Sequence, residues 1–131
     1  MRDEQDDVSD LFASDGGVFV ALDGGSVLVL DESTLEERQR LRSEGEVAIA
    51  WCVTVCGDLA ISGHLDGSLR GWNIATGGCE HVIRGHDAVV RCIVTWEQYL
   101  VTGSDDHTIK IWEVGGTGSW PCLGTIAVHT N

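Results

Sequence analysis

The sequence predicts an all-β fold of three consecutive units, each a four-stranded antiparallel sheet. One observation behind this prediction is an internal repeat, and the other is a turn rich in Asp and Gly between two apolar strands of every copy. Three windows align as strand, turn and strand: FVALDGGSVLVL at 19–30, ISGHLDGSLRGW at 61–72 and VTGSDDHTIKIW at 101–112. Their offsets are 42 and 40 residues, and such self-similarity is the signature of a repeat architecture.

The turn residues predict the central hairpin of each unit. Asp66-Gly67 is the clearest case, because Gly supplies the positive φ of a tight turn without strain. Asp106-His107 and Asp23-Gly24-Gly25 are looser versions at the equivalent places.

The same offsets predict one strand on each side of every hairpin. In front lie VSDLFAS at 8–14, AWCVTVC at 50–56 and VRCIVTW at 90–96, and behind lie ERQRL at 37–41, CEHVI at 79–83 and CLGTI at 122–126. The composition of residues 34–42 also suits a helix, but the repeat register places a turn and an outer strand there. We therefore expect no helix.

Two further motifs recur at these offsets. Gly85-His86 precedes the third unit, and Trp72-Asn73 and Trp112-Glu113 end the third strands of the last two units. Four short strands with Gly-His near the start and Trp at this place resemble the WD40 family, whose repeats are the blades of a β-propeller. The resemblance covers nearly the whole chain.

The resemblance implies the domain organisation. Residues 1–7 are expected to form an acidic, disordered tail, followed by blades at 8–46, 47–86 and 87–131. Propellers usually close with 4 to 8 blades, so three blades leave the ring open. His129 stands where a fourth unit would begin, and we expect a fragment of a longer propeller.

In the WD40 family, a His, a Ser or Thr, an Asp and the Trp of one repeat form a hydrogen-bonded chain. The resemblance implies a complete set in the third unit, formed by His86, Thr102, Asp106 and Trp112. Each of these polar groups is costly to bury alone, and linked together they satisfy one another.

The second unit supplies Ser62, Asp66 and Trp72, but Glu46 occupies the position of the His. Two carboxylates that face each other repel. We therefore expect that the second set does not close and that Trp112, unlike Trp72, has a full set of partners.

The resemblance implies a non-catalytic scaffold or adaptor that binds a partner protein through propeller loops. The expected contact points are the loop before the first strand and the turn between the second and third strands. They supply Arg84, Asp87, His64, Asp105 and His107.

A substrate receptor of a cullin-type ubiquitin ligase is the first alternative. Adaptor-binding repeats of the family carry Trp-Asp-x-Arg, whereas this chain has Trp72-Asn73-Ile74-Ala75 and Trp112-Glu113-Val114-Gly115. The missing Arg counts against this function.

A hydrolase is the second alternative. His86 and Asp106 with a neighbouring hydroxyl have the composition of a catalytic triad. The repeat explains these residues, and the sequence has no Gly-x-Ser-x-Gly motif. We expect no catalytic residue and no cofactor.

Composition excludes several partner classes. The net charge of −13 argues against nucleic-acid binding, and no apolar run is long enough to cross a membrane. The acidic start is the reverse of a signal peptide. With an odd number of cysteines, these features predict an intracellular protein, cytoplasmic or nuclear, with free thiols.

Cys52, Cys56, His64 and His81 could be taken for a zinc site. Because Cys52 recurs as Cys92 in the repeat, we expect buried thiols and no metal.

Open blade faces predict self-association, aggregation or dependence on missing blades. We expect the outward face of the first blade to carry Phe19, Val27 and Val29, and that of the third to carry Val101, Ile109 and Ile111. Such exposed apolar faces are uncommon on soluble monomers.

Overall fold

The computed structural model describes residues 7–14, 16–42, 48–114 and 120–128, and all the regular structure in them is β-strand. The strands are β1 (Val8–Ser14), β2 (Gly17–Leu22), β3 (Val27–Asp31), β4 (Glu37–Leu41), β5 (Ala50–Cys56), β6 (Leu59–His64), β7 (Ser68–Asn73), β8 (Cys79–Arg84), β9 (Val90–Trp96), β10 (Tyr99–Ser104), β11 (Thr108–Glu113) and β12 (Cys122–Ala127). The all-β prediction is confirmed, and residues 37–41 form a strand as the repeat register requires. No helix in these residues is long and apolar enough to span a membrane.

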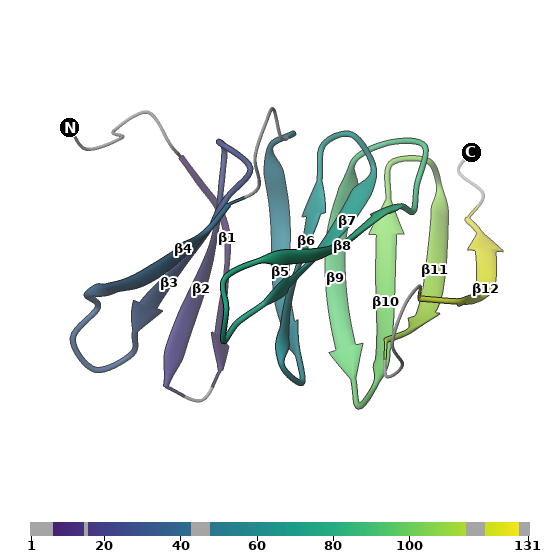
Figure 1. Cartoon of the computed structure of the whole chain (residues 1–131). Coiled ribbons are helices and arrows are strands. Elements are labelled where there is room, and N and C mark those ends of the chain that lie inside the picture. The colour runs from purple at the N-terminus through teal and green to yellow at the C-terminus, as the bar shows by residue number, and fades with distance from the viewer. Residues whose placement is uncertain (1–6, 15, 43–47, 115–119, 129–131) are drawn as a thin grey trace.

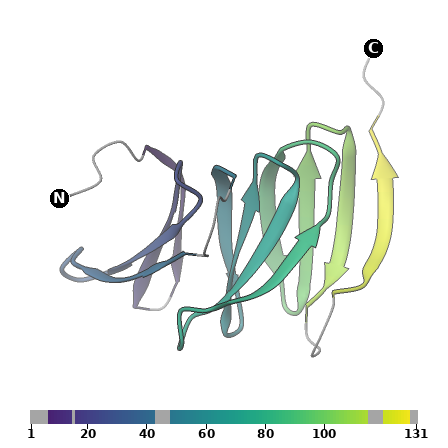
Figure 2. The same ribbon diagram turned by 45° about the horizontal axis from the view of Figure 1, so that its top comes forward.

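The strands form three separate antiparallel sheets, ordered β1-β2-β3-β4, β5-β6-β7-β8 and β9-β10-β11-β12. We call them the first, second and third sheets. They stand in a row in chain order, and the first and third lie at opposite ends of it (Figures 1 and 2). The described residues therefore form three blades without a closed ring.

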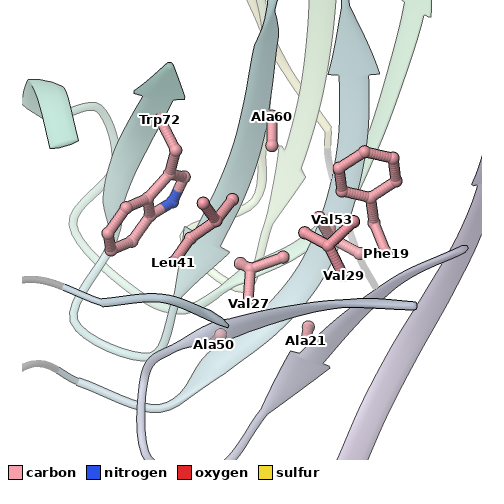
Figure 3. Packing of buried hydrophobic residues seen from close by; sticks show 9 residues of the cluster. All are labelled: Phe19, Ala21, Val27, Val29, Leu41, Ala50, Val53, Ala60 and Trp72. Atoms are coloured by element: carbon pink, nitrogen blue, oxygen red, sulfur yellow. The ribbon is translucent and has the colours of Figure 1, made fainter. Parts of the chain in front are cut away.

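Two apolar joints hold the sheets together. The first joint lies between the first and second sheets and consists of Phe19, Ala21, Val27, Val29, Leu41, Ala50, Val53, Ala60 and Trp72 (Figure 3). The second joint lies between the second and third sheets and consists of Cys52, Ile61, Leu69, Val90, Ile93, Leu100, Trp112, Val114 and Trp120. The second sheet is thus covered on both faces, whereas the first and third sheets are each covered on one face.

The prediction for the outward face of the first blade is wrong. Phe19, Val27 and Val29 are 4%, 0% and 2% exposed, because they face the second sheet in the first joint. Both faces of this hairpin carry apolar side chains, and successive residues of a strand point to opposite faces. Alternation therefore could not tell the covered face from the open one. Val101, Ile109 and Ile111 in the third sheet are half-buried.

The central hairpin turns share one backbone conformation. Gly25, Gly67 and His107 occupy the same repeat position and have φ values of 89°, 88° and 71°. A left-handed φ favours Gly, and His107 adopts it at a cost that Gly25 and Gly67 avoid.

Candidate functional site

A hydrogen-bonded chain crosses the interior of the third sheet. The indole Nε1 of Trp112 donates to Thr102 Oγ1 at 3.0 Å, and Thr102 Oγ1 lies 2.7 Å from His86 Nε2. His86 Nδ1 lies 3.0 Å from Asp106 Oδ2. Because the Thr102 hydroxyl has one proton to give to Nε2, the network assigns the other imidazole proton to Nδ1, which donates to Asp106.

Asp106 ties this chain to the backbone. Its Oδ2 accepts the Asp87 N–H at 3.0 Å, and its Oδ1 accepts the N–H and the hydroxyl of Thr108 at 2.9 and 2.6 Å. Burial alone would raise the pKa of Asp106, but the hydrogen bonds from Thr108, Asp87 and His86 outweigh it and hold the pKa well below its usual range. The carboxylate therefore stays ionised and fixes the loop before β9.

A second chain closes in the second sheet, which corrects the expectation that it would not. Trp72 Nε1 donates to Ser62 Oγ at 2.9 Å, and Ser62 Oγ lies 2.7 Å from His64 Nε2. His64 Nδ1 lies 2.8 Å from the carbonyl oxygen of Ala48 and donates to it. The imidazole of the second chain thus comes from His64 at the end of β6, and the loop before β5 does not need to supply one.

The equivalent contacts in the third sheet explain how His64 fits. Ser104 occupies the position of His64, and its hydroxyl donates to the carbonyl oxygen of Ala88 at 3.1 Å. Asp66 stands outside the chain of Trp72, since its Oδ1 accepts the N–H and hydroxyl of Ser68 at 3.0 and 2.6 Å. Glu46 lies outside the described residues.

His64 is fully buried, and it is therefore not part of the surface that a partner can touch. Burial lowers its pKa to about 4, and the charge of Arg70 acts in the same direction. The hydrogen bond to Ala48 and the charge of Asp66 oppose this shift only in part. The imidazole is neutral at neutral pH.

Acidification should destabilise the chain through His64 as the pH falls from 6.5 towards about 4, by up to roughly 3 kcal/mol. In this window the unfolded chain binds the proton and the folded chain does not, so stability is lost on the acid side. Urea unfolding at pH about 7 and about 4 measures the effect.

His64→Gln is the control for this pH effect. Its amide can accept from Ser62 and donate to Ala48, but it does not titrate. The acid-induced loss should be smaller in the variant, and an equal loss in both proteins would contradict the assignment.

Bulges at the start of the inner strands place side chains at the end of the sheets where the β6–β7 and β10–β11 turns lie. The pairing of β5 with β6 shifts between Ala50 and Cys52, which leaves Trp51 as the extra residue. The pairing of β9 with β10 shifts at the equivalent point and leaves Arg91. A bulge re-aims the side chain that it carries.

Trp51, Arg91 and Asp105 form one cluster across two blades. The Arg91 guanidinium lies 5.3 Å from the centre of the Trp51 ring. Its Nε and Nη2 donate to the two carboxylate oxygens of Asp105 at 2.8 and 3.0 Å. This bidentate pair holds the pKa of Asp105 below its usual range.

The expected partner-binding residues other than His64 are exposed at this end. Arg84, Asp87, Asp105 and His107 are exposed, and Arg84 donates to the carbonyl oxygen of Asp66 at 3.1 Å. We call Trp51, Leu65, Arg84, Asp87, Arg91, Asp105 and His107 the rim surface. Sequence reasoning missed Trp51 and Arg91, because no residue type marks a bulge.

The chain of Thr102, His86 and Asp106 has the order of a catalytic triad, but it lacks an available nucleophile. Thr102 is 0% exposed and its oxygen already accepts the Trp112 N–H. This arrangement fixes the blade and offers no access to a substrate.

The thiols and imidazoles of the second sheet are dispersed. The Cys52 thiol donates to the carbonyl oxygen of Val90, and burial raises its pKa to about 12. Among the described residues, no three His, Cys, Asp or Glu side chains lie close enough to hold a metal ion.

Three four-stranded blades in a row, joined by repeated apolar contacts and braced by two chains of Trp, hydroxyl and His, define a propeller-type repeat protein. The family model "WD domain, G-beta repeat" matches residues 77–113. Residues 77–113 thus form a WD40 repeat, and the chain is homologous to WD40 repeat proteins over part of their length. WD40 domains generally serve as protein-interaction scaffolds and are typically non-catalytic.

Curated relatives match short parts of the chain. WD repeat-containing protein pop2 of Schizosaccharomyces pombe is 42% identical in an alignment of 89 residues that covers 56% of this chain and 13% of that protein. Nuclear distribution protein PAC1-2 of Uncinocarpus reesii is 38% identical in an alignment of 65 residues that covers 48% of this chain and 14% of that protein. The chain thus matches only a small part of these relatives' length.

Solved structures share the fold. The structure of U3-55K superimposes with a TM-score of 0.84 and 17% identity, over 99% of this chain and 42% of that one. The computationally designed Ika4 protein superimposes with a TM-score of 0.80 and 22% identity, over 98% of this chain and 78% of that one. At these identities the likeness concerns the fold alone.

Proposed function

We propose that this chain is a non-catalytic scaffold that binds a partner protein through the rim surface. The observation that carries the proposal is the cluster of Trp51, Arg91 and Asp105, which crosses from the second blade to the third. The odd number of cysteines, all of them free thiols, favours the cytoplasm or nucleus as the setting.

The chemistry of the cluster suits protein recognition. Trp and Arg are the residue types that most often dominate the energetics of protein interfaces. Arg91 is held by two hydrogen bonds and by the Trp51 ring before any partner arrives. A side chain that is already ordered loses less conformational freedom on binding.

Neighbouring side chains give the rim surface a mixed character. Asp87 and His107 are exposed beside the cluster, and Leu65 presents an apolar side chain that is 46% exposed. An aromatic and apolar centre with charges around it is the usual anatomy of a protein interface.

The missing Arg of the adaptor-binding motif still counts against the ubiquitin-ligase alternative. Ala75, which is exposed after β7, stands where the adaptor-binding motif has Arg, and Gly115 lies outside the described residues. The scaffold function needs no such residue, and it is the one we favour.

Asp105→Lys should abolish partner capture, because it removes the bidentate acceptor of Arg91 and reverses the charge beside it. Immobilised chain is incubated with cell extract, and bound proteins are quantified by mass spectrometry. Proteins that bind the wild type and are lost from Asp105→Lys and from Trp51→Ala are the expected result.

Asp58→Lys is the matched control. Asp58 is also an exposed turn aspartate, but it lies in the β5–β6 turn at the opposite end of the sheets. It should retain the same bound proteins. Capture that is equal in wild type and rim variants would contradict the proposal.

A further inference from the structure

Two apolar sheet faces are open at the ends of the row. On the third sheet, Val94, Trp96 and Ile126 are 61%, 70% and 56% exposed. On the first sheet, Val8 and Leu11 are 58% and 60% exposed. We call them the third-sheet face and the first-sheet face.

The third-sheet face repeats the face by which the second sheet enters the second joint. Cys92, Val101 and Ile109 follow Cys52, Ile61 and Leu69 at an offset of 40 residues. The earlier three are 3%, 0% and 0% exposed, because the third sheet covers them. The third-sheet face is therefore built to receive another blade.

The first-sheet face repeats the other half of that joint. Val8, Leu11, Val18 and Leu30 precede Val90, Ile93, Leu100 and Trp112 by 82 residues. The later four are at most 9% exposed and pack on the second sheet. The chain thus displays both halves of a joint that it also contains in closed form.

The finer contacts of the second joint also recur as compatible pairs. A Cβ added at Gly63 would lie 2.6 Å from Val90, so Gly63 makes room for that valine. Gly103 and Val8 are the equivalents on the two open faces.

The second joint contains a pair of polar side chains, and both open faces carry apolar residues at the equivalent positions. The hydroxyls of Thr54 and Thr95 lie 3.4 Å apart. Their equivalents on the open faces are Val94 and Ala13. Two apolar residues replace two hydroxyls, so the open faces match each other and leave no unpaired polar group at this point.

We propose that two copies of this chain bind head to tail, the first-sheet face of each packing on the third-sheet face of the other. The pair closes a ring of six blades, within the range of 4 to 8 in which propellers close. This goes beyond the rim-surface function and does not depend on it, since the two faces lie between blades and the rim lies at their ends.

Sedimentation velocity of the purified chain tests the pairing. We expect a species of twice the 14.1 kDa chain mass. Leu11→Asp and Val94→Asp should each weaken association by about tenfold or more, because an unpaired carboxylate would be buried in the joint. Val82→Asp is the control, since Val82 is 59% exposed but lies on neither open face.

Mixing the two single variants tests the head-to-tail arrangement. Leu11→Asp keeps an intact third-sheet face and Val94→Asp an intact first-sheet face, so the mixture should associate more tightly than either variant alone. Circular dichroism confirms that the variants fold, as expected for substitutions at exposed positions. A monomer at all concentrations, an open ladder of larger species, or no gain on mixing would overturn the proposal.

Discussion

Replacing Gly67 by Ala should destabilise the chain by about 3 kcal/mol, through the left-handed φ and the loss of two backbone hydrogen bonds. The residue has a φ of 88°, and an added Cβ would lie 2.1 Å from the carbonyl oxygen of His86. The turn would have to move away from the loop before β9. In the wild-type chain, the carbonyl oxygen of Gly67 accepts the N–H groups of Gly85 and His86 at 3.2 and 3.0 Å. The movement of the turn would strain both hydrogen bonds.

Gly57→Ala is the matched control for this prediction. Gly57 also has a positive φ, 60°, but a Cβ there would meet no atom within 4 Å. It should cost about 1 kcal/mol, the strain of the backbone alone. Urea unfolding of both variants measures the difference, and equal losses would show that the contact with His86 does not constrain the turn.

The repeat made the fold predictable from the sequence. Every strand was located by aligning three imperfect copies, and even ERQRL, whose composition suits a helix, forms β4. The alignment could not choose between the two faces of the first sheet. Phe19 and Val20 are both apolar, and only the position of the next sheet decides which of them enters the joint.

The site was predictable where it follows the repeat and not where it departs from it. Thr102, His86 and Asp106 occupy family positions and lie in one chain. His64 forms with Ser62 the hydrogen bond that His86 forms with Thr102, but it lies two residues from Ser62 along the same strand and on the same face. The spacing of two residues between Ser62 and His64 is visible in the sequence. It did not enter the prediction, because the family pattern places the His in the loop before β5.

Backbone geometry determines the positions of the two site residues that the sequence did not reveal. Trp51 and Arg91 project at the rim because one extra residue bulges from β5 and from β9. Neither bulge has a Gly or another residue type that marks it. The offset of 40 between Trp51 and Arg91 becomes informative only once the pairing register is known.

Trp72→Ala and Trp112→Ala should each destabilise the chain by about 4 kcal/mol. Trp72 is 0% and Trp112 5% exposed, each donates its indole N–H to a buried hydroxyl, and each lies in one apolar joint. Because both hydrogen-bonded chains are closed, the two losses should be similar, in contrast to the expectation from the sequence that Trp112 has the fuller set of partners. Urea unfolding gives both free energies.

Two further variants make the comparison of the tryptophans decisive. Val82→Ala controls for the loss of an apolar side chain as such, since Val82 is 59% exposed and lies on neither open face, and it should change stability by less than about 0.5 kcal/mol. Trp72→Phe retains an aromatic ring and removes the donor to Ser62, so it should cost about 1 to 2 kcal/mol and remain folded if the alanine variant is not. A Trp72→Phe loss much smaller than that of Trp112→Phe would mean that the contact of His64 with Ser62 does not complete the second chain.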